Sequence, residues 1–278
     1  MREASNARMR NWITHRSITG AAALAALTLA TGCAHQPTAR DNLASAYQEL
    51  NSGNPNYVQV ADTADAYLKE QPTGSAAADA LYLRGRALEE KGQRDASSPQ
   101  KDFSDAYNYY SQALAHNPRP ALAGLIHVGM GNVLYFQDRF SAAINELSSG
   151  IEQLERDTDK AYALYRIGLC YQRLGHWDEA DKQFIAVQQR FPGTDPATRA
   201  QQHQGARAFY VQVGTYAAPA QADATTAELK KQGLPAQRFQ DNARNVQYVR
   251  VGPMNSYEAA LATRQRIWGK YRDAIVFP

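Results

Sequence analysis

The sequence has little cysteine and no long apolar run. Only two of its 278 residues are cysteine, Cys33 and Cys170, and the most apolar stretch covers residues 18–30. Two distant cysteines argue against a disulfide-stapled scaffold, and the six histidines are scattered without a metal-ligand spacing. The apolar stretch is short and rich in Ala and Thr, so it fits an export signal better than a bilayer-spanning helix. The sequence therefore predicts no metal site and no cofactor.

The first 33 residues combine a basic start, an apolar stretch and a cysteine at the end of that stretch. A basic start precedes the apolar stretch, which ends in Leu29-Ala30-Thr31-Gly32-Cys33. This ending resembles the lipobox of bacterial lipoproteins, although the lipobox often has Leu where this chain has Ala30. The resemblance implies a signal peptide over residues 1–32 and an acylated cysteine with its linker over residues 33–40. Residue 34 is Ala, not the Asp that marks many enteric lipoproteins for the inner membrane, which favours an outer-membrane anchor facing the periplasm.

The alternative for Cys33 is an incidental cysteine in an ordinary secreted protein. Cys170 lies deep in a helical pattern, far along the chain from Cys33, and it is expected to be a small buried residue. Several acyl chains on Cys33 would make a stable anchor, whereas a single chain is marginal.

The chain also has no net charge once the predicted leader is removed. The chain has 30 basic and 27 acidic residues, and its first 32 positions hold four of the basic residues and one of the acidic ones. The remaining chain is formally neutral, which argues against general nucleic-acid binding. Its length of roughly 245 residues is enough for two domains.

Between residues 41 and 206, apolar and small side chains recur three or four positions apart, with turn residues between the runs. The clearest unit contains Leu164, Ile167, Gly168, Tyr171, Gly175, Trp177, Ala180, Phe184, Val187 and Pro192. This pattern resembles a tetratricopeptide repeat. Gly168 and Ala180 are expected where two antiparallel helices cross. Tyr171, Phe184 and Val187 are expected to fill the layer against the next unit.

Three looser units precede it, and a helix after Pro196 is expected to cap the array. Residues 93–101 are expected to form an exposed loop, and the helix around Leu147 is expected to run on towards Arg156. The family binds other proteins in a concave groove, which implies an unidentified protein partner. On this chain the groove would include Tyr82, Arg86, Val128, Asn132, Tyr135, Tyr165, Leu169 and Gln172. The alternative is that these residues are simply solvated helix faces.

From Phe209 the helical period gives way to the alternation of strands. Turn and cap residues predict the order strand, helix, strand, strand, helix, strand, with the elements at 210–216, 219–232, 235–240, 246–253, 256–271 and 274–277. This order predicts a ferredoxin-like antiparallel sheet with both helices on one face and the other face open.

Two signatures in this region, Tyr210-Val211-Gln212-Val213-Gly214 and Tyr248-Val249-Arg250-Val251-Gly252-Pro253, resemble the SPOR domain. The resemblance covers residues 207–278. It implies binding to peptidoglycan glycan strands that have lost their stem peptides, and accumulation at division septa, where amidases make such strands. The predicted fold class is therefore multidomain, with an all-α tetratricopeptide-like repeat over residues 41–206 followed by a small α+β SPOR domain.

Strand alternation turns Gln212, Tyr248 and Arg250 towards the open sheet face. An amide can bind sugar hydroxyls, a tyrosine ring can stack on a sugar, and an arginine can pair with the lactyl carboxylate of peptide-free muramic acid. Thr215 and Phe239 are further glycan-binding candidates. Residues 208–278 carry nine basic and five acidic side chains, which suits a polyanionic glycan. Without the resemblance, Tyr248 and Arg250 would be interpreted as ordinary exposed strand residues.

No catalytic constellation emerges from the sequence. Ser98 and Lys101 have a Ser-x-x-Lys spacing, but they lie in a Pro-containing insertion without the accompanying signatures. The prediction is a non-catalytic outer-membrane scaffold that binds glycan and protein partners at the division site. The main alternative is an envelope-assembly or secretion accessory lipoprotein in which the repeats carry the main role. For a third class, a glycan-cleaving enzyme targeted by the SPOR domain, the chain lacks candidate acid or nucleophile residues in an appropriate domain.

Overall fold

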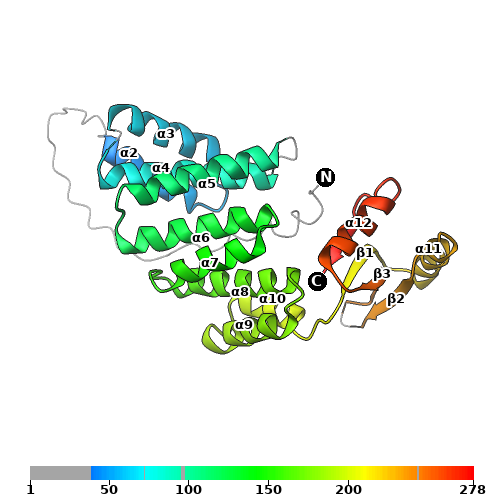
Figure 1. Ribbon diagram of the computed structural model, residues 1–278. Coiled ribbons are helices and arrows are strands. Elements are labelled where there is room, and N and C mark those ends of the chain that lie inside the picture. Colours follow the sequence, from blue (N-terminus) through cyan, green and yellow to red (C-terminus); the bar gives the residue numbers. More distant parts are fainter. Residues whose placement is uncertain (1–38, 72, 95–97, 243) are drawn as a thin grey trace, which may run out of the picture.

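Figure 1 presents the computed structural model, which describes residues 39–71, 73–94, 98–242 and 244–278. Paired helices form an array, and a small sheet domain lies beside its C-terminal half (Figure 1). The predicted leader and Cys33 lie outside the described residues. The array consists of α2 (Ala39–Leu50), α3 (Tyr57–Glu70), α4 (Ser75–Arg94), α5 (Pro99–Ala115), α6 (Pro120–Phe136), α7 (Phe140–Ile151), α8 (Asp157–Arg173), α9 (Trp177–Arg190) and α10 (Asp195–His203).

Glycines allow the two helices of a repeat to approach each other closely. A Cβ atom added at Gly168 in α8 would lie 2.5 Å from the ring of Phe184 in α9, and one at Gly131 would lie 2.5 Å from Leu147. Phe184 and Ala180 are both fully buried, in agreement with their expected places at a helix crossing. The small residues of the sequence pattern are therefore required by helix packing.

Two expected boundaries inside the array differ from the structure. Helix α4 continues through Arg94 and α5 starts at Pro99, so both helices extend into the expected loop. Proline fits the first turn of a helix because a backbone N–H at that position has no hydrogen-bond partner within the helix, so its absence costs little. Helix α7 ends at Ile151 instead of continuing towards Arg156, because a tight turn closes it and buries Leu154 in the core.

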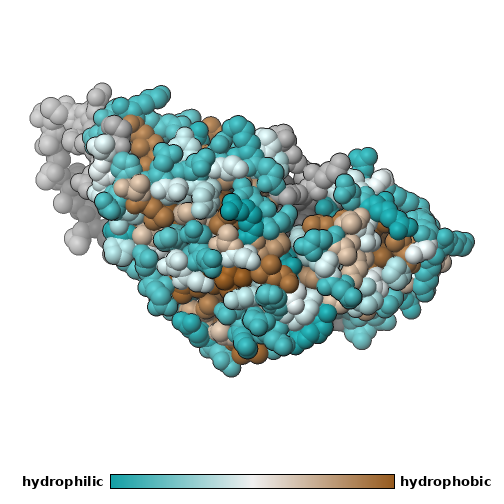
Figure 2. Space-filling view, viewed as in Figure 1, coloured by the Kyte–Doolittle hydropathy of each residue, from teal (hydrophilic) through white to brown (hydrophobic). Residues whose placement is uncertain are grey.

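One hydrophobic core runs through the array from α2 to α10. Cys170 is fully buried in it as a free thiol, as the sequence predicts. Figure 2 shows hydrophilic residues over most of the visible face, with brown apolar residues in several separate groups over the repeat helices. Within the described part of the chain, no helix combines the length and the apolar character needed to cross a membrane.

The small domain is a four-stranded antiparallel sheet with strand order β2-β3-β1-β4, and α11 and α12 pack against it. The helix-facing side of the sheet buries Val211, Val213, Val249 and Val251. The predicted element order and fold class are confirmed, although α12 ends at Ile267, a turn earlier than expected. The elements are β1 (Phe209–Tyr216), α11 (Pro219–Lys231), β2 (Ala236–Asp241), β3 (Val246–Met254), α12 (Tyr257–Ile267) and β4 (Ile275–Phe277).

Candidate functional site

Arg250 lies at the centre of the sheet face that the helices leave uncovered. Its neighbours in β3, Val249 and Val251, are fully buried on the other face, so the pleat directs Arg250 outward. The guanidinium carbon lies 3.8 Å from the centre of the Phe277 ring and 5.3 Å from the centre of the Phe239 ring. A planar cation fits against aromatic faces because their electron-rich surfaces attract it.

Gln212 holds the Arg250 guanidinium from the neighbouring strand. The two residues are cross-strand partners in β1 and β3, and Gln212 Oε1 accepts hydrogen bonds from Arg250 Nε at 3.2 Å and Nη2 at 3.1 Å. The register between these strands shifts between Gln212 and Gly214, as at a β-bulge. Gln212 is only 7% exposed, so its amide oxygen serves mainly to orient Arg250.

Tyr248 stands next to Arg250 on the same face, and its hydroxyl is already engaged. It donates to Asp241 Oδ2 at 3.2 Å and lies 3.5 Å from Arg244 Nη1. Asp241 Oδ1 also accepts from the backbone N–H of Arg244, which closes the turn between β2 and β3. The ring of Tyr248 is therefore held at the end of this hairpin, with its centre 5.3 Å from the Arg250 guanidinium carbon.

The remaining predicted residues lie on the same face. Phe239 in β2 is the cross-strand partner of Tyr248 in β3, so the two side chains lie on the same face of the sheet. Thr215 in β1 is the partner of Tyr248 on the other side of β3. We call the face formed by Tyr210, Gln212, Thr215, Phe239, Tyr248, Arg250 and Phe277 the open face.

Two aromatic residues of the open face were missed by sequence reasoning. Tyr210 makes an edge-to-face contact with Phe239, with ring centres 5.9 Å apart. Phe277 in β4 is the cross-strand partner of Tyr210. Alternation within β1 places Tyr210 and Gln212 on one side, so that signal was available in the sequence. The position of Phe277 depends on the pairing of the last strand with the first.

The open face is suited to binding an anionic, ring-containing ligand. Burial lowers the pKa of Arg250 from its ordinary value, but an arginine remains charged at neutral pH. Within the part of the chain that the structure describes, no acidic side chain forms an ion pair with Arg250. A cation held between aromatic rings and an amide can bind a carboxylate, and the half-buried rings beside it can contact sugars.

The predicted partner groove is less accessible than expected. Tyr82, Asn132 and Gln172 are buried, together with Tyr135, Tyr165 and Leu169, whereas Arg86 and Val128 are half-buried. In the same region Glu89 is buried, and it accepts a hydrogen bond from Asn132 and forms an ion pair with Arg86 at 2.7 Å. Gln172 is bonded to His203 in α10. The role of these residues in partner binding stays a prediction.

The described residues contain no cluster of His, Cys, Asp or Glu that could hold a metal ion. Cys33, the predicted lipidation site, lies outside them.

Comparison with known families matches the two parts of the chain separately. Residues 205–278 match the SPOR domain, and residues 162–194 match a tetratricopeptide repeat. No curated protein matches the chain. A SPOR domain implies peptidoglycan binding, a tetratricopeptide repeat implies interaction with proteins, and both families are typically non-catalytic binding domains. The chain thus contains a tetratricopeptide repeat over residues 162–194 and a C-terminal SPOR domain over residues 205–278.

Proposed function

We propose that this protein is a non-catalytic lipoprotein scaffold of the outer membrane that binds peptide-free peptidoglycan strands through its open face. Its repeats hold a protein partner, and its site of action is the division septum. The observation that carries the proposal is the Arg250 guanidinium, held on the open face by Gln212 and flanked by Phe239, Tyr248 and Phe277.

The chemistry of a peptide-free glycan strand suits this arrangement. Removal of the stem peptide leaves a lactyl carboxylate on each muramic acid, and a guanidinium is a strong partner for a carboxylate. The rings beside Arg250 offer apolar surface to the sugar faces. A strand that still carries its peptides has an amide in place of the carboxylate, so it would lose the charged interaction with Arg250.

The membrane assignment is supported by the sequence alone. Cys33 follows an apolar stretch with small residues before it, and acylation there would place the protein on the periplasmic side of the outer membrane. The septal assignment follows from the proposed ligand, because peptide-free strands are made where amidases act during division.

The first prediction is that Arg250→Ala weakens binding to purified peptide-free glycan chains at least about tenfold, the loss expected from removing one charged hydrogen-bonding group. Gln212→Ala should have a smaller effect because Arg250 keeps its charge but loses its orienting partner. Isothermal titration calorimetry of each full-length variant with the glycan measures both changes in affinity.

Arg272→Ala is the matched control, because Arg272 is an exposed arginine of the same domain that is not part of the open face. It should bind as the unmodified chain does. Equal affinities for Arg250→Ala and Arg272→Ala would mean that the open face does not bind the glycan.

A further inference from the structure

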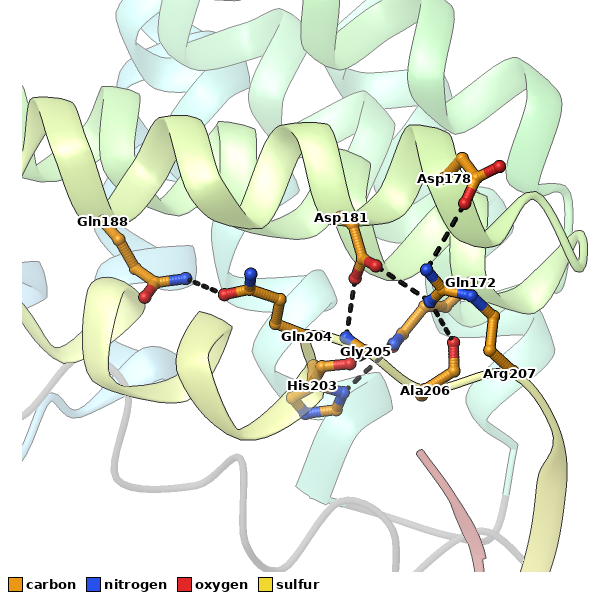
Figure 3. Close-up of polar contacts among 9 residues, drawn as sticks. All are labelled: Gln172, Asp178, Asp181, Gln188, His203, Gln204, Gly205, Ala206 and Arg207. Carbon is orange, nitrogen blue, oxygen red and sulfur yellow. Dashed lines mark hydrogen bonds and ion pairs between the residues drawn. The ribbon is translucent and has the colours of Figure 1, made fainter.

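The segment between the repeats and the SPOR domain is bonded along its length to the array (Figure 3). Gly205 N–H donates to Asp181 Oδ1 at 2.8 Å, and Arg207 Nη1 donates to Asp181 Oδ2 at 2.8 Å. Arg207 Nη2 also lies 3.3 Å from Asp178 Oδ1. Both carboxylates belong to α9, so a single helix of the last repeat holds the connecting segment at several points.

The same segment is also held at its beginning. Gln172 Nε2 in α8 donates to the backbone carbonyl of His203 at 2.8 Å, and its Oε1 lies 3.0 Å from His203 Nδ1. Gln188 Nε2 in α9 donates to Gln204 Oε1 at 2.9 Å. A connecting segment without such bonds would let the two domains move relative to each other.

A second contact joins the domains through aromatic side chains. Tyr257, the first residue of α12, packs against the core of the array as well as the core of the SPOR domain. Its ring centre lies 5.6 Å from that of Phe140, and the guanidinium carbon of Arg173 lies 4.3 Å from it. These two partners come from adjacent repeats, because Phe140 is the first residue of α7 and Arg173 is the last residue of α8. Tyr257 therefore contacts both repeats.

A third contact reaches the strand that carries the glycan site. The fully buried Phe209 begins β1, and its ring centre lies 4.8 Å from that of Trp177 at the start of α9. Phe209 also lies 5.9 Å from Tyr257, measured between ring centres. Trp177 is part of the sequence pattern of the clearest repeat, and its side chain packs against the SPOR core.

We propose that Asp181, Arg207, Trp177, Phe209 and Tyr257 form a rigid joint that fixes the orientation of the SPOR domain on the last two repeats. The open face then points in one direction relative to the array, and a partner bound to the repeats is held at a set distance from the open face. This inference does not depend on glycan binding, because it concerns contacts within the chain.

Distance measurement between spin labels tests the joint in the full chain. The labels are attached to cysteines introduced by Asn108→Cys in α5 and Ala262→Cys in α12, both at exposed positions. The chain also carries Cys33→Ser, so that only the two introduced cysteines react with the label. The native Cys170 is fully buried and should remain unlabelled. Pulsed electron paramagnetic resonance should give one narrow distance distribution for this chain.

The joint variant combines Asp181→Ala with Tyr257→Ala, and it should broaden the distribution while leaving the circular dichroism spectrum unchanged. The matched control combines Asp195→Ala with Tyr162→Ala, which removes an aromatic–carboxylate pair within the array whose atoms lie 3.2 Å apart. The control should keep the narrow distribution.

A broad distribution in the unmodified joint would overturn the proposal, as would a narrow one in the joint variant. If Asp181→Ala with Tyr257→Ala loses its folded spectrum, the exposed Arg207→Ala change alone replaces it and should also broaden the distribution. Glycan binding by the joint variant is expected to be unchanged, so failure of the joint is distinguishable from failure of the open face.

Discussion

Single residues determine how closely the helices of the array pack and how Arg250 is oriented. Gly168 leaves room for the Phe184 ring, and this requirement was predictable because Gly85 and Gly131 occupy the corresponding places in two other units. Alternation in the strands likewise predicted that Gln212, Tyr248 and Arg250 share a face. The stacking of Arg250 on Phe277 was not predictable, since it depends on the pairing of β4 with β1, far apart in sequence.

Gly168→Ala should destabilise the protein by about 1–3 kcal/mol, because the added methyl group would clash with the fully buried ring of Phe184. Gly269→Ala is the matched control, since a Cβ atom there has no neighbour within 4 Å. Urea unfolding of both variants measures the difference. An unchanged unfolding midpoint for Gly168→Ala would contradict the packing role of this glycine.

Among the elements, α10 links the array to the SPOR domain and carries a half-buried titratable group, His203, at its end. Burial lowers the pKa of His203 to about 4, and the charges of Arg173 and Arg199 act in the same direction. The centre of its ring lies 5.8 Å from the ring centre of Tyr165 and 5.8 Å from that of Phe184. A capping helix was predictable from the sequence, but its bonds to α8 and α9 were not, because they join residues from separate turns of the array.

The lowered pKa of His203 gives a pH-dependent contribution to stability. Neutral histidine is favoured in the folded state, so the contribution is fully present above the unfolded pKa of about 6.5 and is lost as pH falls towards 4. The loss is at most about 3 kcal/mol. Replacement by His203→Gln should therefore flatten the dependence of the unfolding free energy on pH between about 6.5 and 4.

His176→Gln is the control for this experiment, because His176 is exposed at a repeat turn. Unfolding free energies measured in urea at several pH values should follow the unmodified protein for His176→Gln. Parallel pH profiles for His203→Gln and the unmodified protein would rule out His203 as the group responsible.

On the scale of the whole molecule, two binding domains are joined through contacts that leave the open face uncovered. The repeats bind to the SPOR domain through Asp181, Trp177 and Phe140, whereas Arg250 lies on the opposite side of the sheet from the helices. The two domains were predictable from the change of period at Phe209. Their mutual contacts were not, because a repeat pattern does not distinguish an aromatic residue of its own core from one that faces another domain.

The central claim is that the open face recognises glycan strands from which the peptides have been removed. The most direct test is co-sedimentation of the full chain with purified sacculi before and after amidase treatment, with Arg250→Ala beside it. Retention should rise after treatment for the unmodified chain and stay low for the variant. Equal retention on both kinds of sacculi, or a rise that Arg250→Ala also shows, would contradict recognition of peptide-free glycan by this face.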